Sequence, residues 1–341
     1  MKMLDSNSLS ISGCATAPAK VILFGEHSVV HGTPAIAVAL NLRSHAQVQI
    51  QKSDAPRLTV KSSAMKLEVS FSSKQLDALG QGSGSNNDST PLDPIALGFY
   101  NVSHLLQMDG FEASLTIDSE IPIGAGLGSS ASVATSSVGA FLAAFKGEID
   151  SLQVREIAFR SEELTHGKPS GIDNTVIALG GLVYFVKGQK PERKTLSAEI
   201  PLVIANTKIP RSTATLVSNV ASLFERKPRA VQNLFDSISD IVEQGLQALL
   251  KSDLEDLGEL MNINHGILHA LGVSHPLLDR YVWVARESGA LGAKLTGAGG
   301  GGCMIALAKD THHANEIKQE LIKAGADAFT SVLTNKGVER C

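Results

Sequence analysis

A glycine-rich segment, Gly-Ala-Gly-Leu-Gly-Ser-Ser at residues 124–130, divides two regular patterns. The apolar residues 115–117 precede it, and a stretch rich in Ala and Ser, residues 131–146, follows it. This order predicts a strand, a tight loop and a helix. Glycines let the backbone approach a ligand closely, and the unpaired N–H groups at a helix start favour an anion. The loop is a candidate phosphate site, although turn-forming glycines and helix-capping serines explain the same residues.

The spacing of the glycines distinguishes this loop from two common nucleotide-binding motifs. A P-loop has a lysine directly after its last glycine, whereas Ser129 follows Gly128 here. A dinucleotide-binding fingerprint reads Gly-x-Gly-x-x-Gly, whereas Gly124, Gly126 and Gly128 are two residues apart. The His-Arg-Asp and Asp-Phe-Gly signatures of protein kinases are absent. None of these templates fits the loop.

Composition limits the classes of partner. The chain has 341 residues, enough for two domains that each bury a core. Lys and Arg number 30 against 34 Asp and Glu, and no long basic run occurs, so we expect no nucleic-acid partner. No run of about 18 apolar residues occurs, so we expect no membrane insertion. Residues 1–14 are polar and lack the apolar core of a targeting segment.

The three cysteines, Cys14, Cys303 and Cys341, are odd in number and far apart in the sequence. They match neither a disulfide framework nor a zinc-binding spacing. The sequence therefore predicts free thiols in a reducing compartment, and we expect a cytoplasmic protein. Cys303 has no basic partner in the sequence and is predicted to be a buried small hydrophobe.

A first strand and one polar segment organise the rest of the chain. The run Lys20-Val-Ile-Leu-Phe24 predicts a buried strand that delivers Glu26 and His27 into a loop. Residues 187–199 are polar and charged and contain Gly and Pro, so we place the domain boundary there. The predicted domains are residues 1–197 and 198–341.

A helix is predicted from about residue 151 to residue 165, because apolar and small residues recur on one face from Val154 onward. At 100° per residue, Glu162 lies about 80° from Val154 and Glu163 about 180°. Glu162 should therefore lie at the edge of the buried face, while Glu163 points to water. A breaker sequence at residues 166–171 ends the helix, and Asp173 lies at the start of the next element.

Three segments, in the same order and well spaced, resemble the signatures of the GHMP small-molecule kinases: PAKVILFGEHSVVHG (18–32), IPIGAGLGSSA (121–131) and KLTGAGGGGC (294–303). Within that superfamily, HGKPSGIDN (166–174) and NTKIPRST (206–213) resemble the mevalonate kinases. The resemblance implies an α+β fold with a ribosomal-S5-like N-terminal α/β domain and a ferredoxin-like C-terminal α/β sandwich. It also implies an active site between the domains.

The resemblance implies ATP as the phosphoryl donor and Mg²⁺ as the metal. The triphosphate would lie on the glycine-rich loop, and Ser119 just upstream would also touch the nucleotide. The loop residues concerned are Gly124, Ala125, Gly126, Leu127, Gly128, Ser129 and Ser130. The Ser130 hydroxyl and the Glu162 carboxylate would hold Mg²⁺. Without the resemblance, a solvated helix carboxylate is the favoured interpretation of Glu162.

The resemblance also implies that Asp173 is the general base for the attacking hydroxyl, with Lys20 beside it. A lysine there would keep Asp173 ionised, stabilise the developing alkoxide and help to neutralise the γ-phosphoryl group. Two ordinary readings remain: Asp173 as the cap of a helix that begins near Asn174, and Lys20 as a surface lysine beside a strand.

The implied acceptor is mevalonate, phosphorylated on its primary C5 hydroxyl to 5-phosphomevalonate in isoprenoid synthesis. Glu26, His27, Asp173 and Thr213 would surround this small carboxylate with two hydroxyls. Alternatives are another GHMP kinase, such as phosphomevalonate kinase or a galactokinase, and a non-catalytic binding protein on the same scaffold. Residues 28–30 lack the acidic residue that galactokinases usually carry there. The sequence leaves the oligomeric state open, a homodimer included.

Two further features receive ordinary readings. His265 and His269 are four residues apart on a predicted helix but lack a Glu between them and an evident third ligand, so we expect packing histidines. For the second glycine-rich stretch, residues 297–302, the resemblance implies a turn of the C-terminal domain close to the active site, where a Cβ would collide with neighbouring backbone.

Overall fold

The computed structural model describes residues 10–82, 89–108, 110–166 and 171–341. Most of the predicted breaker at residues 166–171 lies outside these ranges. Within them the strands are β1 (Ile11–Phe24), β2 (Pro34–Lys52), β3 (Arg57–Ser62), β4 (Leu67–Ser72), β5 (Phe111–Ser119), β6 (Leu182–Val186), β7 (Glu192–Lys194), β8 (Ile200–Asn206), β9 (Gly292–Leu295), β10 (Cys303–Leu307), β11 (Asp327–Leu333) and β12 (Glu339–Arg340).

Runs of helices separate runs of strands along the chain, as expected for an α+β fold. They are the 3₁₀ helix η1 (Ser28–His31) and α1 (Ser73–Gly80), α2 (Asp93–Leu105), α3 (Ser129–Lys146), α4 (Ser151–His166), α5 (Ile172–Leu179), α6 (Thr213–Arg226), α7 (Pro228–Lys251), α8 (Leu254–Ala270), α9 (Pro276–Glu287) and α10 (Thr311–Lys323). None of the helices in the described ranges is both long and apolar enough to span a bilayer.

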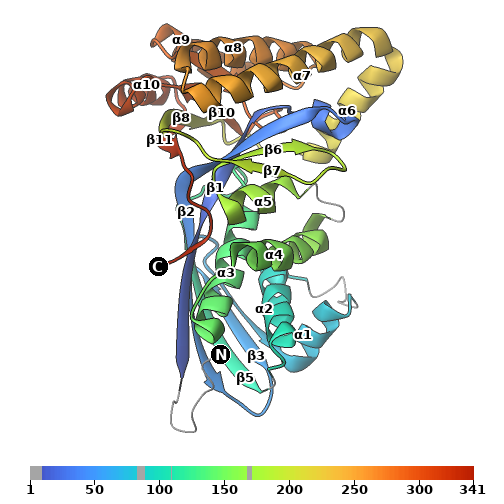
Figure 1. Ribbon diagram of the computed structural model, residues 1–341, viewed down its shortest axis with the longest axis vertical. Coiled ribbons are helices and arrows are strands. Elements are labelled where there is room, and N and C mark those ends of the chain that lie inside the picture. Colours follow the sequence, from blue (N-terminus) through green and yellow to red (C-terminus); the bar gives the residue numbers. More distant parts are fainter. Residues whose placement is uncertain (1–9, 83–88, 109, 167–170) are drawn as a thin grey trace.

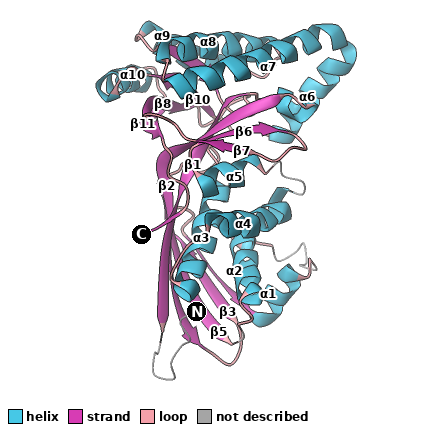
Figure 2. Cartoon of the chain, viewed as in Figure 1, coloured by secondary structure: helices cyan, strands magenta, loops and turns pink. Residues whose placement is uncertain are grey.

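All the described strands belong to one mixed sheet. Its main path runs β4-β3-β5-β2-β11-β8-β10-β9, while β1 pairs with β2 and β12, and β6 pairs with β2 and β7. Only β3 and β5 run parallel; every other described pairing is antiparallel. Figure 1 shows the long strands β1 and β2 passing from the lower half, beside α2, α3 and α4, toward the upper half with α7 to α10. Figure 2 shows the same division of helices about the strands.

The small residues of α3 let this helix pack closely on the sheet. A Cβ on Gly13 of β1 would lie 2.2 Å from the Ala140 carbonyl oxygen, and one on Gly139 would lie 2.9 Å from the Ala15 Cβ. At the start of α3, the Ser132 hydroxyl donates to the Ala17 carbonyl oxygen at 2.9 Å. The start of the helix that follows the glycine-rich loop is thereby fixed against β1, the strand that carries Lys20.

The predicted boundary segment, residues 187–199, contains a short strand. This strand, β7, pairs with β6, which precedes the segment. The sheet also continues past residue 197, since Leu40 of β2 pairs with Leu333 of β11. The last residues of the chain also return to the first half, where β12 pairs with β1. A division at 197/198 stays a prediction about how the domains fold.

The expectation of three free thiols is wrong for two of the cysteines. Cys14 and Cys341 form a disulfide across 327 residues of sequence, with their Cα atoms 5.6 Å apart. The pairing of Ala15 with Arg340 brings the two residues together, a neighbourhood that sequence spacing does not reveal. Cys303 is free and buried, which confirms its predicted burial, and burial raises the pKa of its thiol to about 12.

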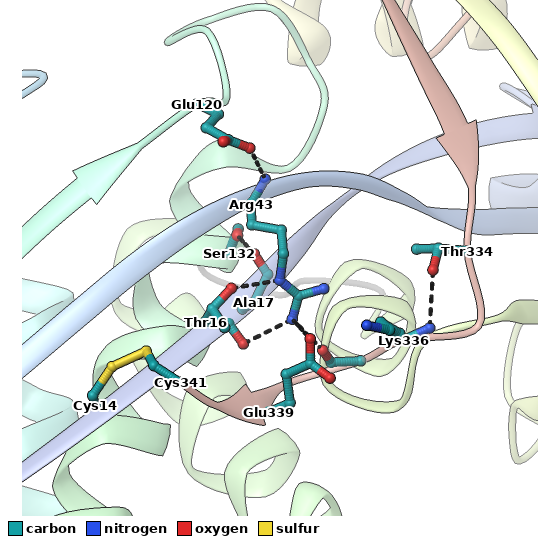
Figure 3. Close-up of polar contacts among 11 residues, drawn as sticks. Cys14, Thr16, Ala17, Arg43, Glu120, Ser132, Thr334, Lys336, Glu339 and Cys341 are labelled. Carbon is teal, nitrogen blue, oxygen red and sulfur yellow. Dashed lines mark hydrogen bonds and ion pairs between the residues drawn. A yellow bond between two sulfur atoms is a disulfide. The ribbon is translucent and has the colours of Figure 1, made fainter. Parts of the chain in front are cut away.

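Arg43 holds the same C-terminal segment by polar contacts (Figure 3). Its guanidinium donates to the Thr16 side chain, to the Thr16 carbonyl oxygen at 3.0 Å and to the Gly337 carbonyl oxygen at 2.6 Å. It also lies 3.5 Å from the Glu339 carboxylate. The terminal segment is thus joined to β1 by strand pairing, by a buried cation and by a covalent bond.

We expect Cys341→Ser to lower the free energy of unfolding by about 2–5 kcal/mol, because the disulfide restricts the unfolded chain over a very long loop. Urea unfolding of the oxidised proteins measures this difference. A dithiol reductant should reproduce the loss in the parent and leave the variant unchanged. Equal midpoints for oxidised parent and variant would contradict the stabilising role.

Candidate active site

The glycine-rich loop leaves β5 and enters α3 through three left-handed glycines. Gly124, Gly126 and Gly128 have φ of 74°, 83° and 77°, values that side-chain-bearing residues rarely adopt. The intervening Ala125 and Leu127 are buried and anchor the loop. Gly128 is the N-cap of α3 and no side chain caps the helix, so the capping explanation for Ser129 and Ser130 is wrong. The first N–H groups of α3 remain available to an anion.

A cavity of about 140 Å³ opens beside this loop. The predicted nucleotide residues Ser119, Gly124, Ser129 and Ser130 lie on its wall. The rest of the lining is mostly apolar: Ala64, Met65, Pro91, Leu92, Pro94, Ile95, Ile117, Ile123, Val133 and Ala134, with Ser62. The structure therefore places an apolar pocket next to the start of α3.

Lys20 and Asp173 meet under the same loop. The Lys20 ammonium lies 3.0 Å from Asp173 Oδ1, and the lysine side chain is only 6% exposed, so it is no surface lysine. The Lys20 backbone N–H donates to the Leu127 carbonyl oxygen at 2.9 Å. A Cβ on Gly128 would lie 3.0 Å from Lys20 Cγ, so glycine lets the loop close onto the lysine.

Asp173 does not cap its helix. The N-cap of α5 is the left-handed Gly171, without a side-chain cap, and α5 begins at Ile172. Asp173 thus lies in the first turn and keeps its carboxylate for Lys20, with the Asp173 side chain 31% exposed. One oxygen is paired while the group stays accessible to a ligand.

Glu162 lies at the edge of the buried face of α4, and Glu163 is exposed, which confirms the helical-wheel prediction. Glu162 Oε2 is buried and has no hydrogen-bond partner among the described residues. Burial, followed by the charge of Asp173, raises the pKa of Glu162 to about 7, although Lys20 opposes the shift. A buried, unpaired carboxylate oxygen beside a second acid is suited to receive a cation.

Arg211 joins the two glycine-rich loops and was not among the predicted site residues. Its guanidinium donates to the Gly301 carbonyl oxygen at 2.7 Å and to the Ala125 carbonyl oxygen at 3.4 Å. A Cβ on Gly126 would lie 1.9 Å from Arg211 Nη2, and one on Gly302 would lie 1.2 Å from Nη1. These glycines make room for the cation, and the 297–302 turn lies close to the site as predicted. Arg211 is part of the 206–213 segment, but only the fold brings it to residue 125.

His27 presents one free ring nitrogen. Its Nε2 lies 2.8 Å from the Ala298 carbonyl oxygen and must donate to it, since a carbonyl only accepts. Burial lowers the pKa of His27, so the ring is neutral and Nδ1 carries a lone pair. Nδ1 is buried and without a hydrogen-bond partner in the described part of the chain. A hydroxyl is the natural donor to it.

Glu26 and Thr213 occupy different surroundings. Glu26 is 1% exposed; one carboxylate oxygen accepts from Lys294 and the other from Asn264 Nδ2 at 3.2 Å. Burial raises the pKa of Glu26, and the Lys294 charge opposes the rise. Thr213 is exposed in the first turn of α6, two residues after Arg211. The structure therefore seats Glu26 inside the protein and leaves Thr213 at the surface.

His265 and His269 share an acid and form no metal cluster. His265 Nε2 and His269 Nδ1 lie 3.3 Å and 3.2 Å from the two oxygens of Asp279. His265 Nδ1 accepts from the Leu295 N–H at 3.3 Å. No group of three or more metal-ligating His, Cys, Asp or Glu side chains occurs in the ranges that the structure covers. The expectation of a packing histidine fits His265, which is buried, and is wrong for His269, whose side chain is 63% exposed.

Comparisons with known proteins agree with this geometry. The family models described as GHMP kinases N terminal domain and GHMP kinases C terminal match residues 97–181 and 246–327. A mevalonate kinase of Thermococcus gammatolerans is 39% identical over 95% of this chain and 97% of that protein. A mevalonate kinase of Arabidopsis thaliana is 32% identical over 96% and 99%.

A solved structure, described as L. major mevalonate kinase in complex with R-mevalonate, superimposes with a TM-score of 0.80. It is 28% identical, and the match covers 98% of this chain and 100% of that one. The α+β fold, the two glycine-rich loops and the full-length similarity to curated relatives lead to one assignment. The chain belongs to the mevalonate kinase family of the GHMP kinases.

Proposed function

We propose that this protein transfers the γ-phosphoryl group of ATP to the C5 hydroxyl of mevalonate, giving 5-phosphomevalonate and ADP for isoprenoid synthesis. The observation that carries the proposal is the Lys20–Asp173 pair beneath the amide-lined start of α3, 3.0 Å between charged atoms. This arrangement puts a base, a cation and a phosphate-binding helix start in one place. The family assignment supplies the substrates.

The triphosphate would bind along residues 124–130, where the backbone N–H groups before and after Gly128 lack partners from a cap. The adjoining apolar cavity would take the adenine ring, since a flat base gains by leaving water. Ser119 lines that cavity and is within reach of the nucleoside.

The residues present fit a magnesium ion. The buried Glu162 oxygen lacks a partner among the described residues, and Ser130 is exposed in the first turn of α3. These two oxygens would hold Mg²⁺ together with phosphate oxygens, the usual way in which proteins bind this ion with nucleotides. The metal supplies charge neutralisation on the transferred group when bound.

In the chemical step, the C5 oxygen of mevalonate forms a bond to the γ-phosphorus while the bond from that phosphorus to the bridging oxygen of ADP breaks. The hydroxyl proton passes to the Asp173 carboxylate. Lys20, whose ammonium lies 3.0 Å from Asp173 Oδ1, offsets negative charge on the developing alkoxide and the γ-phosphoryl oxygens. Asp173 returns the proton to solvent after product release, because its side chain is partly exposed.

The acceptor would lie between η1 and the second glycine-rich turn. His27 Nδ1 would accept from an acceptor hydroxyl, and Thr213 would offer a hydroxyl of its own from α6. Arg211 adds a cation near both the phosphate loop and the acceptor, which carries a carboxylate. Glu26, whose two carboxylate oxygens are bonded to Lys294 and Asn264, would support this side of the site through His27.

A direct assay tests the function. With ATP, Mg²⁺ and R-mevalonate, ADP release should proceed at a rate on the order of 1–100 per second, typical of kinases. Galactose and 5-phosphomevalonate, the substrates of the alternative GHMP activities, should give background rates. ADP release that does not depend on mevalonate would refute the assignment, and nucleotide binding without turnover would favour a non-catalytic protein.

We also propose that the protein lies in the cytoplasm and forms a homodimer. A cytoplasmic location supplies ATP, although the Cys14–Cys341 disulfide removes the argument from free thiols. Mass measurement in solution decides between a monomer and a dimer.

A further inference from the structure

A buried ion pair holds the loop that carries Glu26 and His27. Lys294 of β9 is 0% exposed, and its ammonium bonds to one oxygen of Glu26, the residue before His27. The ammonium also donates to the Leu295 carbonyl oxygen at 2.8 Å, and Asn264 of α8 donates to the other Glu26 oxygen at 3.2 Å. The pair therefore joins the end of β1 to two elements of the C-terminal half.

Stability alone does not explain this pair. Taking two charges out of water costs more than their attraction returns in many proteins, and well-packed apolar residues often replace such pairs without loss. Burial raises the pKa of Glu26 and lowers that of Lys294, and each shift is opposed by the partner's charge. A buried pair is best attested where it fixes one arrangement of the chain.

The arrangement fixed here is an unusual turn. His27 has a φ of 62°, in the left-handed region that disfavours a residue with a side chain. Gly25, two residues earlier, has a φ of 96°. The turn is closed by Ser28 N–H to the Glu26 carbonyl oxygen at 2.7 Å and by Val29 N–H to the Gly25 carbonyl oxygen at 3.2 Å. Such a backbone persists only where the surroundings hold it.

The surroundings that hold it come from β9 and the turn after it. The Lys294 ammonium donates to the Glu26 carboxylate, and Thr296 Oγ1 donates to the Ile22 carbonyl oxygen at 2.7 Å. The Ala298 carbonyl oxygen accepts from His27 Nε2 at 2.8 Å. Three alternate residues of one segment thus fix three points around the His27 turn. Of these three contacts, only the one between Lys294 and Glu26 is an ion pair.

We propose that Lys294 is a positioning residue for acceptor recognition: through Glu26 it holds the His27 turn so that the free Nδ1 faces the acceptor. The inference rests on the proposed function and deepens it, since it assigns Glu26 an indirect role. Loss of Lys294 releases Glu26 and the turn, and misplaces His27 without touching the nucleotide loop. Acceptor affinity therefore depends on Lys294, whereas nucleotide affinity does not.

The first test compares Lys294→Met with Arg286→Met. Lys294→Met is expected to raise the KM for mevalonate about 10- to 100-fold, as a misplaced binding group does, and to leave the KM for ATP within about twofold. Arg286 of α9 donates to the Ala293 carbonyl oxygen at 2.8 Å, one residue before Lys294, and does not touch Glu26. Its variant perturbs the same packing and should leave both KM values unchanged.

A double variant keeps the test informative if Lys294→Met folds poorly. Glu26→Gln/Lys294→Met removes both charges and leaves no unpaired buried ion, so it should fold better than the single variant. Its KM for mevalonate should rise about as much as in one single variant, since both act through one contact. A rise equal to the product of the single effects would overturn the shared positioning role.

Hydrogen exchange provides a readout that needs no substrate. The amides of Ser28 and Val29 should exchange faster in Lys294→Met and at the parental rate in Arg286→Met. Unchanged exchange, an unchanged KM for mevalonate, or the same changes in Arg286→Met would each overturn the inference. If the parent itself does not phosphorylate mevalonate, the proposed function fails, while the exchange comparison still decides whether Lys294 holds the turn.

Discussion

Asp173→Asn should lower kcat by at least about 10²-fold and leave the KM for ATP nearly unchanged, because the amide cannot accept the proton of the attacking hydroxyl. The substitution keeps the shape of the side chain beside Lys20, whose ammonium lies 3.0 Å from Oδ1 in the parent. Steady-state kinetics with varied ATP and varied mevalonate, together with nucleotide binding measured by calorimetry, separate chemistry from binding.

The matched control is Asp327→Asn. Asp327 pairs with Lys208 at 3.3 Å, but both side chains are largely exposed and the pair lies outside the site. This variant should retain parental kinetics, since exposed pairs contribute little. Turnover of Asp173→Asn close to that of the parent would refute the role of Asp173 as the base.

Glu162→Gln should raise the Mg²⁺ concentration required for half-maximal activity at least about tenfold and leave mevalonate binding little changed, because the amide is a poor ligand for Mg²⁺. Glu163→Gln is the control, since Glu163 is the next residue on α4 and is exposed. Mg²⁺ titrations of the three proteins at fixed ATP measure the effect. An unchanged Mg²⁺ requirement in Glu162→Gln would remove Glu162 from the metal site.

The Mg²⁺ requirement of the parent should also depend on pH in a way that the Mg²⁺ requirement of Glu162→Gln does not. The pKa of Glu162 is raised to about 7, so the protonated fraction grows as the pH falls below 7 and Mg²⁺ must then displace a proton. The Mg²⁺ requirement of the parent should rise with falling pH in that range, and that of Glu162→Gln should not. Without metal, the parent loses stability as the pH rises from the usual carboxyl range through about 7, so the glutamine variant should be the more stable above pH 7.

Local pattern was enough to predict the parts of the site that lie within one element. The glycines at 124, 126 and 128 fit a loop with positive φ values, and the 3.6-residue period placed Glu162 rather than Glu163 toward the interior. The resemblance predicted that Lys20 and Asp173 lie in one site, and in the structure the two side chains are in contact.

Three contacts could not be read from spacing. Arg211 reaches Ala125 across 86 residues, Lys294 reaches Glu26 across 268, and Cys14 reaches Cys341 across 327. None of these pairs shares a helix face or a hairpin. Cys14 and Cys341 meet because β1 pairs with β12, and the other two contacts join residues of the first half of the chain to residues of the second.

Local sequence therefore predicted a glycine-rich loop and an inward-facing acid, since turn chemistry and helical period act over a few residues, whereas the role of Asp173 came from the resemblance. Strand register across the sheet specified which cation supports which acid and which cysteines pair. Register depends on the packing of whole faces against each other, so it emerges only when distant segments are already side by side. The strained turn at His27 belongs to the second kind, because its support comes from β9 and the turn that follows.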